Sequence, residues 1–196
     1  MLESMQQTVD VLSCIRSYPW IIEMVKSKLF HEICDQHETQ QKRRCYFCCD
    51  CMIPPFCTTC YKKNDHKGHT LIQTYRSSYQ TGVKKETMSK YMDLSGIHIY
   101  SINGFPIIYI NQRRGNDNHR FRNNVMHKCQ VCEWELDAAS SALFCSMECK
   151  FRSVLGSQLD ELMENSEITE NSEETDEQVK KKRHRRKGSP HRAPLF

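Results

Sequence analysis

The stretch that decides the fold is residues 34–69, CDQHETQQKRRCYFCCDCMIPPFCTTCYKKNDHKGH. It holds four pairs of metal-binding residue types, each with a gap of two residues: Cys34 with His37, Cys48 with Cys51, Cys57 with Cys60, and His66 with His69. A two-residue gap lets both side chains of a pair reach one ion from a tight turn. Eight such ligands suffice for two closed tetrahedral zinc sites. A second set supplies four thiolates for a third site: Cys129, Cys132, Cys145 and Cys149.

Composition favours zinc over disulfides as the reinforcement of this chain. The 196 residues include 12 Cys and 9 His, and only 38% are hydrophobic, so the core is small and needs cross-links or metal. We see no secretory signal at the N-terminus and no apolar run long enough to span a membrane, and we therefore expect a reducing compartment. A disulfide-rich secreted fold is the alternative, but it gives no role to His at ligand spacing.

The eight ligands of the first set can be sorted onto two ions in sequential or in crossed order. Their order, Cys-His, Cys-Cys, Cys-Cys, His-His, resembles that of the B-box zinc finger, which is crossed. This resemblance implies one site of Cys34, His37, Cys57 and Cys60, and a second site of Cys48, Cys51, His66 and His69. Cys45 also stands at ligand spacing from Cys48, so Cys45 or Cys49 could replace Cys48 or Cys51. We expect Cys14, Cys45 and Cys49 to be spare thiols.

The chain is predicted to be a small zinc-stabilised α+β protein with a helix that begins at Pro19 and a second helix from Lys84 to Leu94. We expect the apolar face of the first helix to cover the first zinc module. Asn103-Gly104 between two β-branched and aromatic runs predicts a β-hairpin, and Pro106 predicts that its strand lies at a sheet edge or is bulged. The expected segments are a flexible N-terminus (1–17), the first helix with a B-box-like two-zinc module (18–69), a helix and β-hairpin segment (70–114), a linker and four-cysteine zinc module (115–156), and a disordered tail (157–196).

Charge is unevenly distributed along the chain, although the net charge is only +4. Residues 157–178 hold nine acidic and no basic residues, and residues 180–192 hold eight basic and no acidic residues. The rest of the chain therefore carries about +5. Few large apolar residues follow residue 157, which predicts that the acidic and then basic tail is disordered.

Sequence motifs give no support to an enzyme. Each cluster offers four protein ligands, whereas a catalytic zinc usually keeps one position open for water. We find no His-Glu-x-x-His run, no Gly-rich phosphate loop and no Gly-x-Ser-x-Gly elbow. We therefore expect no catalytic residues.

Several blocks of sequence stand in a characteristic order between about Tyr18 and Arg152. The blocks are Pro19-Trp20, the ligand pairs from Cys34 to His69, Ile72-Gln73, residues 76–79 (RSSY), residues 91–96 (YMDLSG), residues 100–103 (YSIN) and residues 144–150 (FCSMECK). Together they resemble the PLATZ family of plant AT-rich sequence- and zinc-binding proteins. Tyr75 departs from the family, which commonly has Arg before the Arg-Ser-Ser-Tyr block. The resemblance implies a zinc-dependent transcriptional regulator, often a repressor, that favours A/T-rich DNA.

Basic residues around the predicted zinc modules suit phosphate contacts. The candidates are Lys62, Lys63, Lys67, Arg76, Arg113 and Arg114. The alternative is a protein-interaction module or scaffold of transcription complexes, because B-box-like units commonly bind proteins. A run of basic residues in the tail predicts a nuclear localisation signal: Lys180, Lys181, Lys182, Arg183, Arg185, Arg186 and Lys187.

Overall fold

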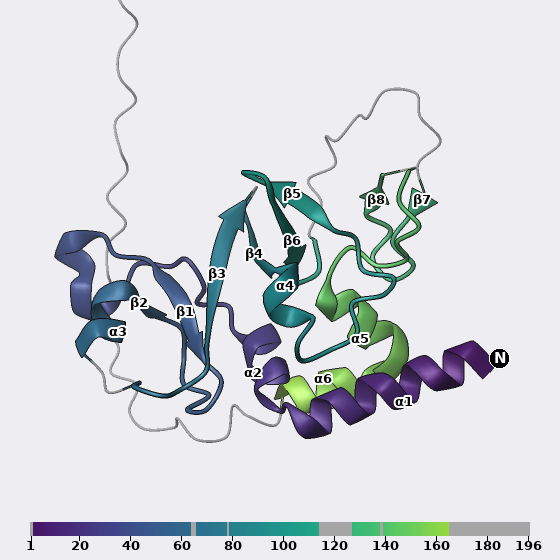
Figure 1. Cartoon of the computed structure of the whole chain (residues 1–196), viewed down its shortest axis with the longest axis horizontal. Coiled ribbons are helices and arrows are strands. Elements are labelled where there is room, and N and C mark those ends of the chain that lie inside the picture. Colours follow the sequence, from purple (N-terminus) through teal and green to yellow (C-terminus); the bar gives the residue numbers. More distant parts are fainter. Residues whose placement is uncertain (1, 64–65, 78, 114–126, 138, 165–196) are drawn as a thin grey trace, which may run out of the picture. The chain divides into compact units, whose positions relative to one another are not determined.

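The computed structural model describes residues 2–63, 66–77, 79–113, 127–137 and 139–164. Helices and strands alternate irregularly along this part of the chain, as in an α+β protein, which confirms the predicted fold class (Figure 1). The elements are α1 (Leu2–Ser17), α2 (Trp20–Lys26), the 3-10 helix η1 (Asp35–Gln40), β1 (Arg44–Cys48), β2 (Phe56–Cys57), α3 (Thr58–Lys63), β3 (Leu71–Ser77), β4 (Gln80–Lys84), α4 (Lys85–Met88), β5 (Tyr100–Ile102), β6 (Phe105–Tyr109), β7 (His127–Lys128), β8 (Glu135–Leu136), α5 (Met147–Leu155) and α6 (Ser157–Glu164).

A six-stranded antiparallel sheet in the order β2-β1-β3-β4-β6-β5 joins the first half of the chain, and β7 and β8 form a separate ribbon. Close packing across the sheet requires Gly82 in β4, because a Cβ atom there would clash with Cγ2 of Ile107. The predicted two-zinc module thus shares one sheet with the β-hairpin, whereas the ribbon of the four-cysteine module is not part of that sheet.

One face of this sheet carries the main hydrophobic core. Phe47, Ile72, Val83 and Ile108 come from four successive strands and are fully buried. Helices α1, α2, α5 and α6 contribute the apolar side chains that pack against them, and Figure 1 shows these helices grouped together beside the strands. Burial of this apolar area is the main contribution to the stability of a domain of this size.

Helix α2 begins after Pro19, as predicted, but its apolar face does not cover the first zinc module. Trp20, Ile21, Met24 and Val25 belong to the main core instead. The helix has this position because its neighbour α6 comes from a distant part of the sequence, which local periodicity cannot reveal. Leu29, which stands at helical spacing from Val25 in the sequence, lies beyond the end of α2 and is 41% exposed.

The predicted β-hairpin is confirmed between β5 and β6. Ile102 pairs with Phe105, and Asn103 and Gly104 have positive φ angles of 51° and 79°. The predicted edge position of the Pro106 strand is wrong, since β6 lies between β4 and β5. Pro106 is tolerated because it lies just beyond the last pair with β4, which joins Lys84 to Ile107.

Three other local expectations differ from the structure. The N-terminus is helix α1, with Val11 buried in the core, where we expected a loose segment. The helix expected from Lys84 to Leu94 is reduced to the four residues of α4, because the chain then turns so that Met88 and Met92 reach the core. The expected tail also begins later, since α6 packs Leu159 into the core with no exposed area.

The first part (115–126) of the predicted linker and four-cysteine segment, Arg114 and residues 165–196 lie outside the described residues. In the part of the chain that the structure describes, no helix combines the length and the apolar character needed to cross a membrane. The remaining domain boundaries stay predictions.

Candidate metal centres

The first group of metal-binding side chains joins the first and third sequence pairs. Cys34 precedes η1, and His37 lies within η1 where the backbone kinks (φ −138°, ψ 34°). Cys57 ends β2, and Cys60 lies in α3 one turn later. The Nδ1 atom of His37 lies 3.6, 3.5 and 3.4 Å from the sulfurs of Cys34, Cys57 and Cys60, and the sulfurs of Cys34 and Cys60 are 3.6 Å apart. All four residues are buried.

These distances match the edges of a tetrahedron around one ion. Zinc bonds of about 2.3 Å to sulfur and about 2.0 Å to nitrogen place two sulfurs about 3.8 Å apart, and a sulfur and a nitrogen about 3.5 Å apart. A group of three thiols and one imidazole therefore has both the size and the soft donor atoms that suit zinc.

The second group joins the second and fourth sequence pairs, Cys48, Cys51, His66 and His69. Nδ1 of His69 lies 3.4 Å from the sulfur of Cys48 and 3.2 Å from that of Cys51, and Nδ1 of His66 lies 3.7 Å from the sulfur of Cys51. The Phe56 ring stacks on the His66 ring with centroids 4.8 Å apart, which fixes the orientation of this imidazole. The grouping of the eight side chains is that of the crossed arrangement.

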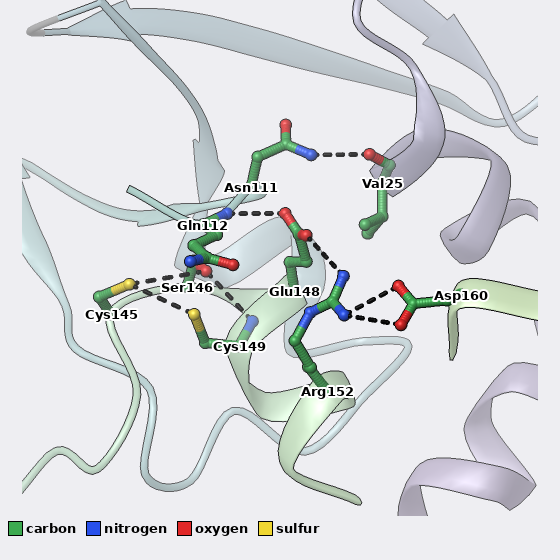
Figure 2. Close-up of polar contacts among 9 residues, drawn as sticks. All are labelled: Val25, Asn111, Gln112, Cys145, Ser146, Glu148, Cys149, Arg152 and Asp160. Atoms are coloured by element: carbon green, nitrogen blue, oxygen red, sulfur yellow. Dashed lines mark hydrogen bonds and ion pairs between the residues drawn. The ribbon is translucent and has the colours of Figure 1, made fainter. Parts of the chain in front are cut away.

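The third group consists of Cys129, Cys132, Cys145 and Cys149, whose sulfurs also lie within 4.8 Å of one another. The first two belong to the β7–β8 ribbon, and the last two stand at the start of α5 (Figure 2). Ser146 caps α5, because its hydroxyl accepts a hydrogen bond from the Cys149 backbone N–H at 3.3 Å. Cys145 precedes this cap and Cys149 lies in the first turn that follows it, and their sulfur atoms are 3.6 Å apart.

In each group a backbone N–H donates a hydrogen bond to one of the sulfurs. The N–H of Cys51 donates to the Cys48 sulfur, that of Cys60 to Cys57, and that of Cys145 to Cys129, each at 3.4 Å. Burial opposes ionisation of Cys57, but hydrogen bonds from the backbone of Cys60 and Thr59 lower its pKa. Side-chain hydrogen bonds from Cys145 and Cys149 lower the pKa of Cys129. Thiolates are the form that binds metal.

An ion-pair network that sequence reasoning missed docks the third group onto the sheet (Figure 2). The Glu148 carboxylate accepts a hydrogen bond from the backbone N–H of Gln112 at 2.8 Å and pairs with Arg152 at 3.4 Å. Arg152 also contacts both carboxylate oxygens of Asp160 in α6, at 2.8 and 3.1 Å. Asn111 donates to the Val25 carbonyl at 2.7 Å. Two sequence signals could have indicated part of this arrangement. Ser146 is a typical residue at the start of a helix, and Glu148 and Arg152 are four residues apart, which is the spacing of an ion pair on one helix face.

The three spare cysteines lie outside the groups that could hold an ion among the described residues. Cys49 is buried in the main core, and burial raises its pKa to about 12. Burial likewise raises the pKa of Cys14 to about 11, and its thiol donates to the Tyr91 carbonyl at 3.4 Å. Burial also raises the pKa of the half-buried Cys45. Position and not ionisation separates these thiols from the groups, because burial also raises the pKa of the grouped Cys60 to about 11 and that of the grouped Cys132 to about 12.

The predicted phosphate-binding residues fall into two classes. Lys62, Lys63 and Lys67 are exposed and lie close in sequence to the ligands Cys60, His66 and His69. Arg76 is also exposed, with its guanidinium 5.6 Å from the centre of the Tyr79 ring.

Arg113 differs from the lysines, because its guanidinium is engaged within the protein. It lies 4.1 Å from the centre of the Trp134 ring, 5.1 Å from that of Tyr109 and 5.4 Å from that of Tyr100. This stacking connects the third metal group to the sheet. Arg114 and the basic run of 180–187 lie outside the described residues.

A family model described as "PLATZ transcription factor" matches residues 75–151. An uncharacterized protein of Arabidopsis thaliana is 84% identical over 110 residues, which are 56% of this chain and all of that protein. The Arabidopsis thaliana protein RGF1 inducible transcription factor 1 is 28% identical over 136 residues, which are 69% of this chain and 50% of that protein. The chain thus spans about half the length of this second relative, and no solved structure matches.

Proposed function

Because this chain belongs to the PLATZ transcription factor family, we propose that it is a zinc-dependent DNA-binding regulator of transcription. A family of transcription factors also agrees with the expectation that the chain is not an enzyme. The finer parts of the proposal are a preference for A/T-rich duplexes and a repressing role, which the family resemblance implies. Three zinc ions per chain would hold the scaffold together.

The observation that carries this proposal is the position of three exposed lysines on the metal groups themselves. Lys62 and Lys63 follow the ligand Cys60 in α3, and Lys67 lies between the ligands His66 and His69. Among the described residues, no acidic side chain lies within ion-pair distance of them. Their charges are therefore available to phosphates, and the metal fixes where they point.

Zinc dependence follows from this placement. Metal binding is coupled to folding in small sites of this kind, so removal of zinc would release the lysines from their fixed positions. Arg76 on β3 belongs to the same proposal, and a basic side chain in a narrow A-tract minor groove would give A/T preference through DNA shape.

The decisive experiment is a salt-titrated binding assay with A/T-rich and G/C-rich duplexes, with and without chelator. We expect binding that weakens steeply as salt rises, prefers the A/T-rich duplex and disappears when zinc is removed. Binding that persists after complete zinc removal would contradict the proposal.

A protein-interaction module is the second candidate function, and an exposed apolar loop favours it. Met52 and Ile53, between the ligands Cys51 and Cys57, are 44% and 37% exposed. An apolar protein interface responds weakly to salt, whereas phosphate binding responds strongly, so the same titration separates the two candidates.

Nuclear location is part of the proposal, through the basic run of 180–187. Neutralising Lys180, Lys181, Lys182 and Arg183 in a fluorescent fusion too large to diffuse through pores should leave the fusion in the cytoplasm. Unchanged nuclear accumulation would assign import to another segment or to a partner.

A further inference from the structure

The sheet face opposite the main core carries a row of aromatic and basic side chains. Tyr46 pairs with Gln73, and Tyr75, two residues further along β3, pairs with Gly82 of β4. Lys84, two residues beyond Gly82, pairs with Ile107 of β6, and Phe105 lies two residues from Ile107. Paired residues of antiparallel strands project to the same face, and so do residues two apart. We call Tyr46, Tyr61, Tyr75, Lys84 and Phe105 the outer face.

Contacts between these side chains make the outer face continuous. The Tyr61 ring, from α3, stacks on the Tyr46 ring with centroids 5.6 Å apart and an angle of 22° between planes. The Lys84 ammonium lies 4.6 Å from the centre of the Phe105 ring and 5.7 Å from that of Tyr75. A cation therefore lies between two aromatic rings, each on a different strand.

The rings of the outer face are accessible to a partner. Phe105 is 52% exposed and Tyr61 is 41% exposed, while Tyr75 is half-buried. Large aromatic side chains are normally buried in a core, so partly exposed rings on a sheet face outside the main core need a reason. The main core does not include them, since its sheet residues project from the other face.

We propose that the outer face binds a single-stranded nucleic acid, with unpaired bases stacked on Tyr75 and Phe105. A duplex hides the faces of its bases in its own stack, so only an unpaired base can lie flat on a protein ring. Tyr75 and Phe105 stand on β3 and β6, with β4 between them, and two inter-strand spacings of about 4.8 Å give room for separate bases.

Charge favours a nucleic acid over an apolar protein partner at this face. Lys84 lies between the two rings, and Lys62 and Lys63 follow Tyr61 directly. None of the three lysines forms an ion pair with another described residue. Exposed rings interleaved with unpaired cations are the arrangement in which phosphates and base faces are bound together.

This inference goes beyond duplex binding and does not depend on it. The test uses the full-length zinc-loaded protein with two fluorescent probes, a thymine-only DNA strand and a uracil-only RNA strand, and compares them with an A/T-rich duplex. The variants are Tyr75→Leu and Phe105→Leu, which keep apolar volume and remove the ring. The matched control is Tyr79→Leu, because Tyr79 is 90% exposed and contacts Arg76, which projects from the opposite face of β3 next to Tyr75.

We expect each ring variant to bind single strands at least about fivefold more weakly, and the control to bind as the wild type does. The strand, DNA or RNA, whose affinity falls more in the ring variants is the one that the outer face prefers. Zinc content and thermal midpoint report whether each variant is folded, and Lys84→Gln offers a second, non-aromatic variant that should also weaken single-strand binding.

Two results would overturn the inference: a wild-type protein without affinity for either strand at low salt, or folded ring variants that bind as the control does. In the first case the outer face is assigned to a protein partner. Failure of the proposed duplex-binding function would give a different result, because the wild-type protein would then bind single strands and not the duplex.

Discussion

Glu148 accepts a hydrogen bond from the backbone N–H of Gln112 at 2.8 Å, and it does so from a position between two metal-binding thiols, Cys145 and Cys149. The same helix, α5, buries Met147 and Phe151 in the main core. The third metal group and the core are therefore joined through one short helix. Loss of either is expected to weaken the other.

The first prediction concerns this connection. Glu148→Ala should lower the free energy of unfolding by about 2 kcal/mol, because a hydrogen bond to a charged acceptor is lost and Arg152 keeps only Asp160. Urea unfolding of the zinc-loaded protein measures this. Glu148→Gln should cost less, since its amide oxygen can still accept from Gln112.

Glu161→Ala is the matched control for Glu148→Ala, because Glu161 is exposed on α6. A surface change of this kind should stay within about 0.5 kcal/mol of the wild type. Equal effects of the two alanine variants would show that the Glu148 contact contributes nothing specific.

The second prediction concerns the choice of ligands among adjacent cysteines. Cys48→Ser should reduce the zinc content from three to two ions per chain, whereas Cys45→Ser and Cys49→Ser should keep all three. The reason is that Cys48 belongs to a four-residue group and the other two do not. Metal analysis of purified protein, freed of loosely bound ions, gives the count. Zinc loss in Cys45→Ser with retention in Cys48→Ser would reverse the assignment.

The third prediction concerns a buried lysine. Lys150 is 3% exposed, and its ammonium donates to the Asp93 carboxylate at 2.9 Å and to the carbonyls of Asp93 and Ser95 at 2.8 and 2.9 Å. Asp93→Ala removes the counter-charge from a buried cation and should cost about 3 kcal/mol. Lys150→Met should cost less, because the Asp93 side chain is 54% exposed and water can solvate it. Urea unfolding that ranks the two variants in the opposite order would contradict this.

The Asp93–Lys150 pair also predicts how the free energy of unfolding depends on pH. Burial alone would raise the pKa of Asp93, but hydrogen bonds from Ser95 and Lys150 lower it from 3.8 to about 2. A carboxyl with a lowered pKa in the folded state contributes stability that is fully present above its unfolded value and is lost as pH falls through about 2. The difference in unfolding free energy between wild type and Asp93→Ala should therefore be the same at pH 6 and pH 8.

The candidate ligand pairs could be proposed from the sequence because their spacing is a local property, and the crossed grouping came from the resemblance to the B-box order. A gap of two residues and a known order of pairs suffice to propose Cys34, His37, Cys57 and Cys60 as one group, and the structure brings these side chains together. The Asn103-Gly104 hairpin was predictable for the same reason, since its turn geometry is set by two residues.

Contacts between distant segments could not be predicted in this way. Asp93 and Lys150 are 57 residues apart, and no local pattern connects them. The outer face depends on the strand order β3-β4-β6, which places Tyr75 near Phe105 although a long connection separates their strands. Helix α1 was missed because Val11 finds its partners in α5, which lies far along the chain.

The last prediction separates the body of the protein from its tail. The described core ends with α6, where Leu159 has no exposed area, so a truncation should follow Glu164 and not residue 156. The truncated protein should bind DNA more weakly, because it lacks the basic run of 180–187, yet keep its preference for A/T-rich over G/C-rich duplexes. Within it, replacing Lys62, Lys63 and Lys67 by Gln should reduce the slope of log affinity against log salt by about 0.9 per lysine that contacts a phosphate.

Arg113→Ala in the same truncated protein should have the opposite effects to the three lysine changes. Its guanidinium stacks on Trp134 and Tyr109, so its loss should lower the thermal midpoint and leave the salt slope nearly unchanged. The three lysine changes should do the reverse, since these side chains are exposed and hold nothing in the core. A lysine variant with an unchanged slope and an Arg113 variant with a reduced one would move the phosphate contacts from the first two metal groups to the sheet end beside the third.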